Sequence, residues 1–205
     1  ASAKASSPPS ASNTVIYVGR LSPEKGLTNL IAAWAKASLD PPHRLLIVGD
    51  GPHRGALQRQ AQSLGLREPE VTFTGWKDPA EVHDLLVSAR ALVLPTIWYE
   101  GGGCPVSVVE AMAAGRPVLI SDIGGMREIV NHTRNGLCIP AGNVDTLASA
   151  LRRLLFTPAE ADAMGAAARV DYDAKYGVEQ NFQSLMHIYE FALKRAGKNA
   201  ERATF

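Results

Sequence analysis

Short apolar runs alternate with amphipathic stretches along most of the chain. Runs rich in Val, Ile and Leu predict buried strands over residues 14–18, 45–48, 71–74, 91–94, 117–121 and 136–139. Apolar residues at helical spacing predict helices over residues 27–38, 54–64, 81–89, 107–114, 125–130, 144–155, 158–168 and 178–195. Continuous apolar strands that alternate with helices are typical of a parallel sheet covered on both faces. The pattern therefore predicts an α/β fold, a Rossmann-like doubly wound parallel sheet.

The two ends of the chain depart from this pattern. Residues 1–13 are dominated by Ala, Ser and Pro, which predicts a disordered linker or the cut edge of a longer protein. One domain is expected over residues 14–195, followed by a polar tail over residues 196–205.

Composition narrows the class of protein. The net charge is +1 and no dense basic block occurs, so the chain is not expected to bind nucleic acid. Cys104 and Cys138 are the two cysteines, without the spacing of a metal site, which favours a reducing, cytoplasmic location. No apolar run approaches the roughly 20 residues that span a bilayer.

The loop after the first predicted strand has the sequence GRLSPEKG and carries two cations. Gly19 permits a tight exit from the strand, and Arg20 and Lys25 then lie at the carboxyl edge of the sheet, where such folds bind ligands. Together these cations would suit a diphosphate. The alternative is an ordinary solvated loop.

A glycine-rich turn precedes the helix predicted from residue 107. Its three glycines would let the backbone approach a ligand closely, while Val106 and Ser107 would offer backbone N–H groups to phosphate. Glu110, expected in the first helical turn, could accept hydrogen bonds from a ribose or simply balance the helix dipole. Glu100 could reach the hydroxyls of a second sugar.

Together these motifs resemble the C-terminal, donor-binding domain of the GT-B-fold glycosyltransferases of family 4, also called group 1. The resemblance covers about residues 14–195. The motifs that carry it are VGRLSPEKG, LLIVGDGP, VTFTGW and VVEAMAAGRPVLISDIGGMREIV. It implies a retaining, metal-independent enzyme with a nucleotide-diphosphate sugar, such as a UDP- or GDP-sugar, as donor, and no cofactor. Arg20, Lys25 and Glu100 would then be the catalytic residues.

The resemblance also implies which residues of the predicted loops bind each part of the donor. Arg20, Lys25 and the backbone at Val106 and Ser107 would bind the diphosphate, with Gly19 and Pro105 beside them. Glu110 would bind the ribose, and Glu100 would face the transferred sugar. Trp76 and Lys77 would border the base, although Trp76 could equally be a packing residue.

The spacing of the two glutamates departs from the family pattern. The family has seven residues between them, whereas nine separate Glu100 from Glu110. In the interpretation that we favour, the three glycines accommodate the two additional residues of the loop, and Glu100 still reaches the sugar. In the alternative interpretation, the contact between Glu100 and the sugar is lost.

The resemblance further implies an N-terminal, acceptor-binding domain that this chain lacks. The chain alone is then expected to bind the donor without transferring sugar. Any peripheral contact with the inner face of the cytoplasmic membrane would be made by the missing half. Two alternatives remain: a non-catalytic nucleotide-binding module, favoured by the glutamate spacing, and another GT-B enzyme, such as a nucleotide-sugar epimerase or a phosphorylase.

Overall fold

A computed structural model describes residues 7–39, 42–98 and 105–202. Six strands form a parallel sheet in the order β3-β2-β1-β4-β5-β6. The chain moves outward from β1 to β3 and then returns to place β4 on the other side of β1. This arrangement confirms the predicted doubly wound α/β fold, and it puts the topological switch point between β1 and β4.

The elements follow one another in the predicted order. The strands are β1 (Thr14–Val18), β2 (Arg44–Val48), β3 (Val71–Gly75), β4 (Ala91–Leu94), β5 (Val118–Ser121) and β6 (Gly136–Ile139). The α-helices are α1 (Leu27–Ala37), α2 (Arg54–Ser63), α3 (Pro79–Ser88), α4 (Val106–Ala113), α5 (Met126–Ile129), α6 (Val144–Phe156), α7 (Pro158–Lys175) and α8 (Val178–Arg202). Two short 3-10 helices complete the described fold, η1 (Pro9–Ala11) and η2 (Pro23–Lys25).

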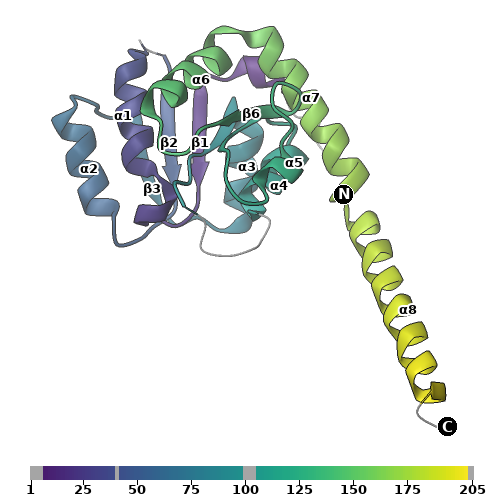
Figure 1. The fold of residues 1–205 in the computed structure, drawn as a ribbon. Helices are drawn as coiled ribbons and strands as arrows, with labels where there is room; N and C mark the ends of the chain where they lie inside the picture. Colours follow the sequence, from purple (N-terminus) through teal and green to yellow (C-terminus); the bar gives the residue numbers. More distant parts are fainter. Residues whose placement is uncertain (1–6, 40–41, 99–104, 203–205) are drawn as a thin grey trace.

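The sheet lies between two layers of helices (Figure 1). Helix α1 packs against α2 and α6 in one layer, and α4 packs against α3 and α7 in the other. The interior strands β4 and β5 are buried along their whole length. Helix α1 turns the predicted apolar face toward the sheet, and Leu30, Ile31 and Trp34 are fully buried there.

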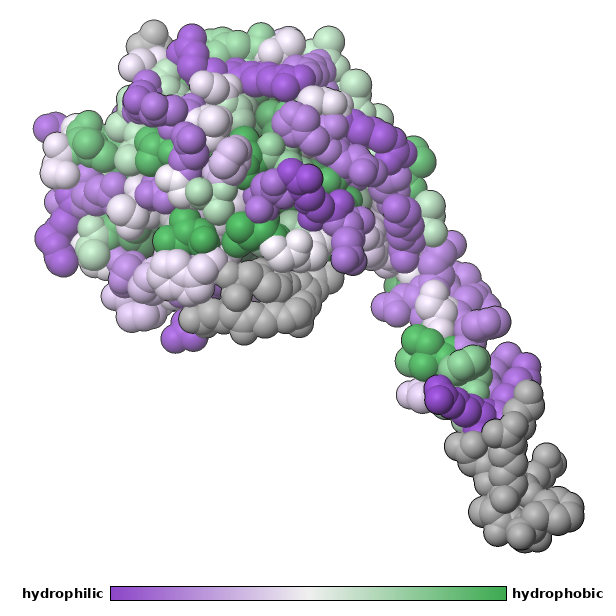
Figure 2. Space-filling model, viewed as in Figure 1, coloured by the Kyte–Doolittle hydropathy of each residue, from purple (hydrophilic) through white to green (hydrophobic). Residues whose placement is uncertain are grey.

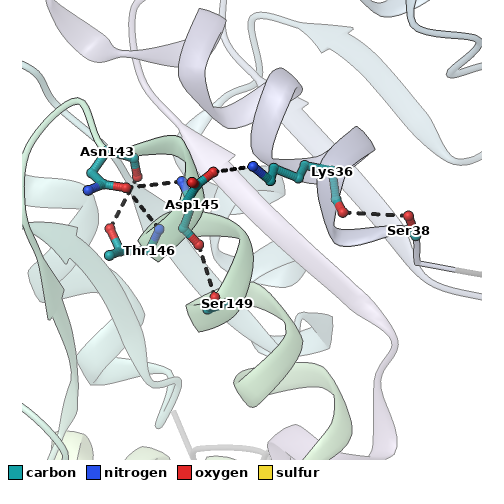
Figure 3. A network of polar contacts seen from close by, with 6 residues as sticks. All are labelled: Lys36, Ser38, Asn143, Asp145, Thr146 and Ser149. Carbon is teal, nitrogen blue, oxygen red and sulfur yellow. Dashed lines mark hydrogen bonds and ion pairs between the residues drawn. The ribbon is translucent and has the colours of Figure 1, made fainter.

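Polar contacts hold α6 against α1 at the surface (Figure 3). The Asn143 side chain caps α6, because its Oδ1 accepts hydrogen bonds from the N–H groups of Asp145 and Thr146 at 3.0 Å. The Asp145 carboxylate, in the first turn of α6, pairs with the Lys36 ammonium on α1. Both partners of this ion pair are exposed, so it adds little to the stability of the fold.

Residues 7–13 differ from the disordered linker expected there, because buried side chains of the domain bind their backbone. Arg116 Nη2 donates to the carbonyl of Ser7 at 2.7 Å, and Arg90 Nε donates to the carbonyl of Ser12 at 2.6 Å. The N–H of Ser10 donates to Asp162 Oδ1 at 2.7 Å. Both arginines are buried, so these carbonyls satisfy donors that would otherwise be costly to bury. Composition alone could not reveal partners that lie so far away in the sequence.

Two helices run further than predicted. Helix α7 continues beyond residue 168 to Lys175, and α8 continues beyond residue 195 to Arg202, through most of the expected polar tail. The α8 extension has the sequence AGKNAER, in which five residues are Ala, Lys, Glu or Arg, types that favour helices. Helix α8 packs against α7 and then extends away from the body of the domain (Figure 1).

Helix α7 is tied to the segment before β6 by a buried polar network. Asp171, which is 6% exposed, accepts hydrogen bonds from Arg134 at 2.6 and 2.9 Å and from Asn135 Nδ2 at 2.7 Å. Fully buried Asn135 also donates from Nδ2 to the Ile129 carbonyl at 3.1 Å, and its Oδ1 accepts from the Asn131 N–H at 2.8 Å. Burial alone would raise the pKa of Asp171, but the hydrogen bonds from Arg134 and Asn135 outweigh it and hold that pKa below its ordinary value.

Candidate functional site

The loops after β1, β2 and β3 meet at the carboxyl edge of the sheet. Gly49 in the loop after β2 lies so close to the loop after β1 that a Cβ there would be 2.0 Å from the Gly19 carbonyl oxygen. The N–H of Leu21 donates to the carbonyl of Asp50 at 2.9 Å, which joins the same loops. The glycines therefore permit a close approach of two backbones, and this approach shapes the edge of the sheet.

Tyr17 supports the loop that carries Arg20. The ring is fully buried at the end of β1, and its hydroxyl donates to the Arg20 carbonyl at 2.8 Å. Burial, reinforced by the charge of Glu24, raises the pKa of Tyr17, so the hydroxyl stays a donor at all ordinary pH values. Tyr17 is therefore part of the core, and it also fixes the backbone that carries the Arg20 side chain.

Four of the predicted site residues line one pocket of about 330 Å³ at this edge. Gly19 and Arg20 come from the loop after β1, whereas Trp76 and Lys77 come from the loop after β3. Val18, Val48 and Val82 supply an apolar wall, and Asp50 adds a carboxylate. The pocket thus combines an apolar surface with charged groups, as small-molecule sites commonly do.

Trp76 and Lys77 differ in how they are held. Trp76 is 72% exposed, so its ring is not the packing residue that the sequence left as an alternative. Lys77 Nζ forms an ion pair with Glu81 at 2.7 Å, on the first turn of α3. Asp78 and Glu81 form a capping box at the same helix end, so the backbone after Lys77 is fixed while the Trp76 ring remains accessible.

Lys25 lies on the other side of the same loop, toward β4. Gly26 follows it in the left-handed conformation, at φ +70°, and a Cβ there would be 2.0 Å from the Pro95 carbonyl oxygen after β4. The N–H of Ile97 donates to the Glu24 carbonyl at 2.8 Å. The structure therefore binds the loop of Arg20 and Lys25 directly to the start of the segment that leads to α4, across the switch point.

Glu24 is a charged residue at this site that the sequence did not single out. A hydrogen bond from Ser22 lowers its pKa most, and the positive charges of Lys25 and Arg20 lower it further. Among the described residues, neither Arg20 nor Lys25 forms an ion pair within 4.0 Å. The sequence RLSPEKG could have indicated this residue, because it places the acidic Glu24 between the two cations.

Helix α4 begins at Val106, and Pro105 precedes it without a side-chain cap. Val108 is the first residue of this helix whose N–H bonds a described residue, the carbonyl of Pro105 at 3.0 Å. The backbone at Val106 and Ser107 therefore provides helix N-terminal N–H groups beside the switch point. Val106 is itself 68% exposed.

Glu110 lies one residue further into its helix than predicted. Because α4 starts at Val106, Glu110 is the fifth helical residue and lies outside the first turn. Its side chain is half-buried. A role as an N-terminal dipole partner is therefore weakened, since that effect decays within the first turn. Glu100 and Cys104 fall outside the described residues.

The described residues contain no group of three or more His, Cys, Asp or Glu side chains that could hold a metal ion. No helix among them is both long enough and apolar enough to cross a membrane.

A substitution at Gly26 tests how closely the loop after β1 packs against the segment after β4. Gly26→Ala should destabilise the fold by about 2–5 kcal/mol, because an alanine there adds left-handed strain to a clash with backbone. Gly65→Ala is the matched control: Gly65 has φ +79° but no atom within 4 Å of the added Cβ, so strain alone should cost about 1–2 kcal/mol. Urea denaturation measures both. Equal losses would show that the contact with Pro95 is not tight.

Comparison with known proteins identifies relatives. The sequence matches the model of the family described as glycosyl transferases group 1, over residues 2–171. An uncharacterized glycosyltransferase of Methanocaldococcus jannaschii is 32% identical over 184 residues, which is 90% of this chain and 46% of that protein. The chain therefore spans about half the length of the curated relatives it matches.

Solved structures agree with this family. Sucrose-phosphate synthase from Thermosynechococcus elongatus has a TM-score of 0.79 and 29% identity, over 91% of this chain and 47% of that one. Anabaena HepE, solved in complex with UDP, has a TM-score of 0.78 and 26% identity, over 87% of this chain and 49% of that one.

Proposed function

Since this chain belongs to the group 1 glycosyl transferases, we propose that it binds the nucleotide-diphosphate sugar donor for transfer of a sugar to an acceptor hydroxyl. The observation that carries the proposal is the pocket in which Gly19, Arg20, Trp76 and Lys77 come together beside the switch point. Ligands of doubly wound sheets bind at such points.

The diphosphate would lie between the loop after β1 and the start of α4. Arg20 can bind phosphate oxygens with two N–H groups, and Lys25 adds a compact positive charge. The N–H groups at Val106 and Ser107 complete a site that attracts anions at the helix N-terminus. Glu24 would partly balance the two cations when no donor is bound.

The nucleoside would occupy the pocket itself. The apolar wall of Val18, Val48 and Val82 suits the faces of a base and a ribose, and the exposed Trp76 ring offers a surface for stacking. Glu110, half-buried on α4, would accept hydrogen bonds from the ribose hydroxyls. Glu100 is proposed to face the transferred sugar.

Departure of the nucleoside diphosphate is the step that these groups would assist. Negative charge builds up on the leaving diphosphate as the sugar–oxygen bond breaks, and Arg20, Lys25 and the α4 N–H groups would stabilise it. We propose that the reaction retains the anomeric configuration and that these protein groups serve in place of a metal ion. No cofactor beyond the donor is proposed.

Transfer would also require a domain that binds the acceptor. This chain covers 46% of the Methanocaldococcus relative, so we propose that a second domain supplies the acceptor site and that the donor binds in the cleft between the two. The 205-residue chain should then bind the donor without transferring sugar. Any contact with a membrane surface is assigned to that second domain.

Calorimetric titration of the 205-residue chain with UDP, GDP, their sugars and the free nucleosides tests this proposal. One nucleoside diphosphate should bind in a one-to-one complex, and its nucleoside should bind much more weakly because it lacks the diphosphate. HepE was solved with UDP, and a relative in Mycobacterium tuberculosis is a GDP-mannose-dependent mannosyltransferase, so both bases are included. Absence of binding by every compound would refute donor binding.

A further inference from the structure

Glu24 is an acidic residue held in place within the loop that we assign to the diphosphate. It lies in η2, directly before Lys25, and its carbonyl accepts a hydrogen bond from the Ile97 N–H at 2.8 Å. Its carboxylate accepts a hydrogen bond from the hydroxyl of Ser22, which is buried. Both the backbone and the side chain of this acid are therefore fixed.

The carboxylate acts on the two cations of the loop without pairing with either. The hydrogen bond from Ser22 lowers the pKa of Glu24 most, but the positive charges of Lys25 and Arg20 lower it further, so these charges interact. No acidic oxygen among the described residues lies within 4.0 Å of the Arg20 or Lys25 side-chain nitrogens. Both cations thus remain available to a ligand, with a fixed negative charge beside them.

The donor and the product of sugar transfer differ in charge. The bond between the anomeric carbon and the terminal phosphate oxygen breaks, and both electrons stay on that oxygen. The acceptor oxygen bonds to the anomeric carbon, and its proton passes to water. The terminal phosphate, with about one negative charge while the sugar is attached, then carries about 1.5 to 2 at pH 7. A fixed carboxylate nearby therefore repels the product more strongly than the donor.

We infer that Glu24 determines how this site discriminates between donor and product, because its carboxylate opposes the terminal phosphate and favours release of the nucleoside diphosphate. This inference rests on the proposed function. Arg20 and Lys25 alone would attract the more highly charged product more strongly than the donor, and the product would then occupy the site. Product release limits turnover in many enzymes, so a charge that weakens product binding serves the reaction.

Calorimetric titration of the 205-residue chain with UDP, UDP-glucose, GDP and GDP-mannose tests the inference. Glu24→Gln removes the charge but keeps an oxygen that can accept the hydrogen bond from Ser22. It should lower the Kd of whichever nucleoside diphosphate binds by roughly 5- to 10-fold, and that of the matching nucleotide-sugar by roughly half that factor. The dissociation rate of the diphosphate, measured by stopped-flow displacement, should fall with its Kd.

Three controls separate the charge of Glu24 from other effects. Hydrophilic residues cover much of the surface seen in Figure 2, so the loss of any one negative charge has to be compared with another. Glu68→Gln removes the same charge from an exposed residue before β3, at the amino edge of the sheet, and should leave all affinities unchanged. Glu24→Asp keeps the charge and should bind each compound within roughly twofold of the parent chain. Added salt should reduce the gain in Glu24→Gln.

The sign of the change decides between two roles of Glu24. Weaker diphosphate binding by Glu24→Gln would overturn the inference, because the carboxylate would then position the cations for the ligand. No change in affinity, equal gains for diphosphate and nucleotide-sugar, or a gain of the same size in Glu24→Asp would overturn it too. A parent chain that binds none of the four compounds would refute the proposed function, and this inference with it.

Discussion

Replacing Arg20 with alanine is expected to weaken binding of a nucleoside diphosphate by about 1.5–3 kcal/mol, a roughly 10- to 150-fold rise in Kd. Lys25→Ala should have an effect of similar size. Each substitution removes a cation that we place on the diphosphate, and a charge-assisted hydrogen bond contributes on this scale. Calorimetric titration of the variants measures the change.

Arg44→Ala provides the matched control. Arg44 is an exposed arginine that begins β2, so it lies at the amino edge of the sheet, opposite the pocket. Arg44→Ala removes the same positive charge as Arg20→Ala and should leave the affinity for the nucleoside diphosphate unchanged. Affinity for the free nucleoside should be unchanged in Lys25→Ala and Arg44→Ala, because neither residue lines the pocket. If Arg20→Ala and Lys25→Ala bind the diphosphate as tightly as the parent chain, the loop after β1 does not hold it.

Asp171→Ala is expected to lower the free energy of unfolding by about 2–4 kcal/mol, because it removes the acceptor for Arg134 and for fully buried Asn135. Asp173→Ala, two residues along α7, breaks an exposed ion pair with Arg169 and should cost less than about 1 kcal/mol. Urea denaturation near neutral pH compares the two.

The same network should give the protein a dependence on acid. Hydrogen bonding holds the folded-state pKa of Asp171 below that of the unfolded chain, which is about 3.9. Its contribution to stability is therefore complete above pH 4 and is lost as the pH falls through the folded-state pKa. The difference in stability between the parent chain and Asp171→Ala should shrink below about pH 4. A constant difference would mean that the charge of Asp171 does not contribute.

Local pattern was sufficient for the strands. The runs at β1, β4 and β6 are mostly apolar and are followed by Gly or Pro, so their limits could be predicted residue by residue. The loops that form the site followed from strand order, because parallel strands bring their carboxyl ends to one edge. Gly19, Arg20, Trp76 and Lys77 were accordingly expected near one another, and they line one pocket.

Long-range side-chain contacts could not be predicted in this way. The folded segment at residues 7–13 depends on Arg90, Arg116 and Asp162, which no local pattern connects to it. The network of Asp171 likewise joins residues 36 and 37 positions apart. Glu110 was placed one residue too early in α4 because the start of this helix depends on the preceding loop, where the sequence offers several glycines and a proline.

The strand order separates two parts of the proposed donor site along the edge of the sheet. The loop of Trp76 and Lys77 follows β3, the outermost strand on its side, whereas the loop of Lys25 touches the segment after β4 near the middle. Residues 76 and 77 can thus change during evolution without disturbing the tightly packed centre. In the proposed donor site, changes at residues 76 and 77 would alter the preference for the nucleobase and leave the contacts with the diphosphate in place.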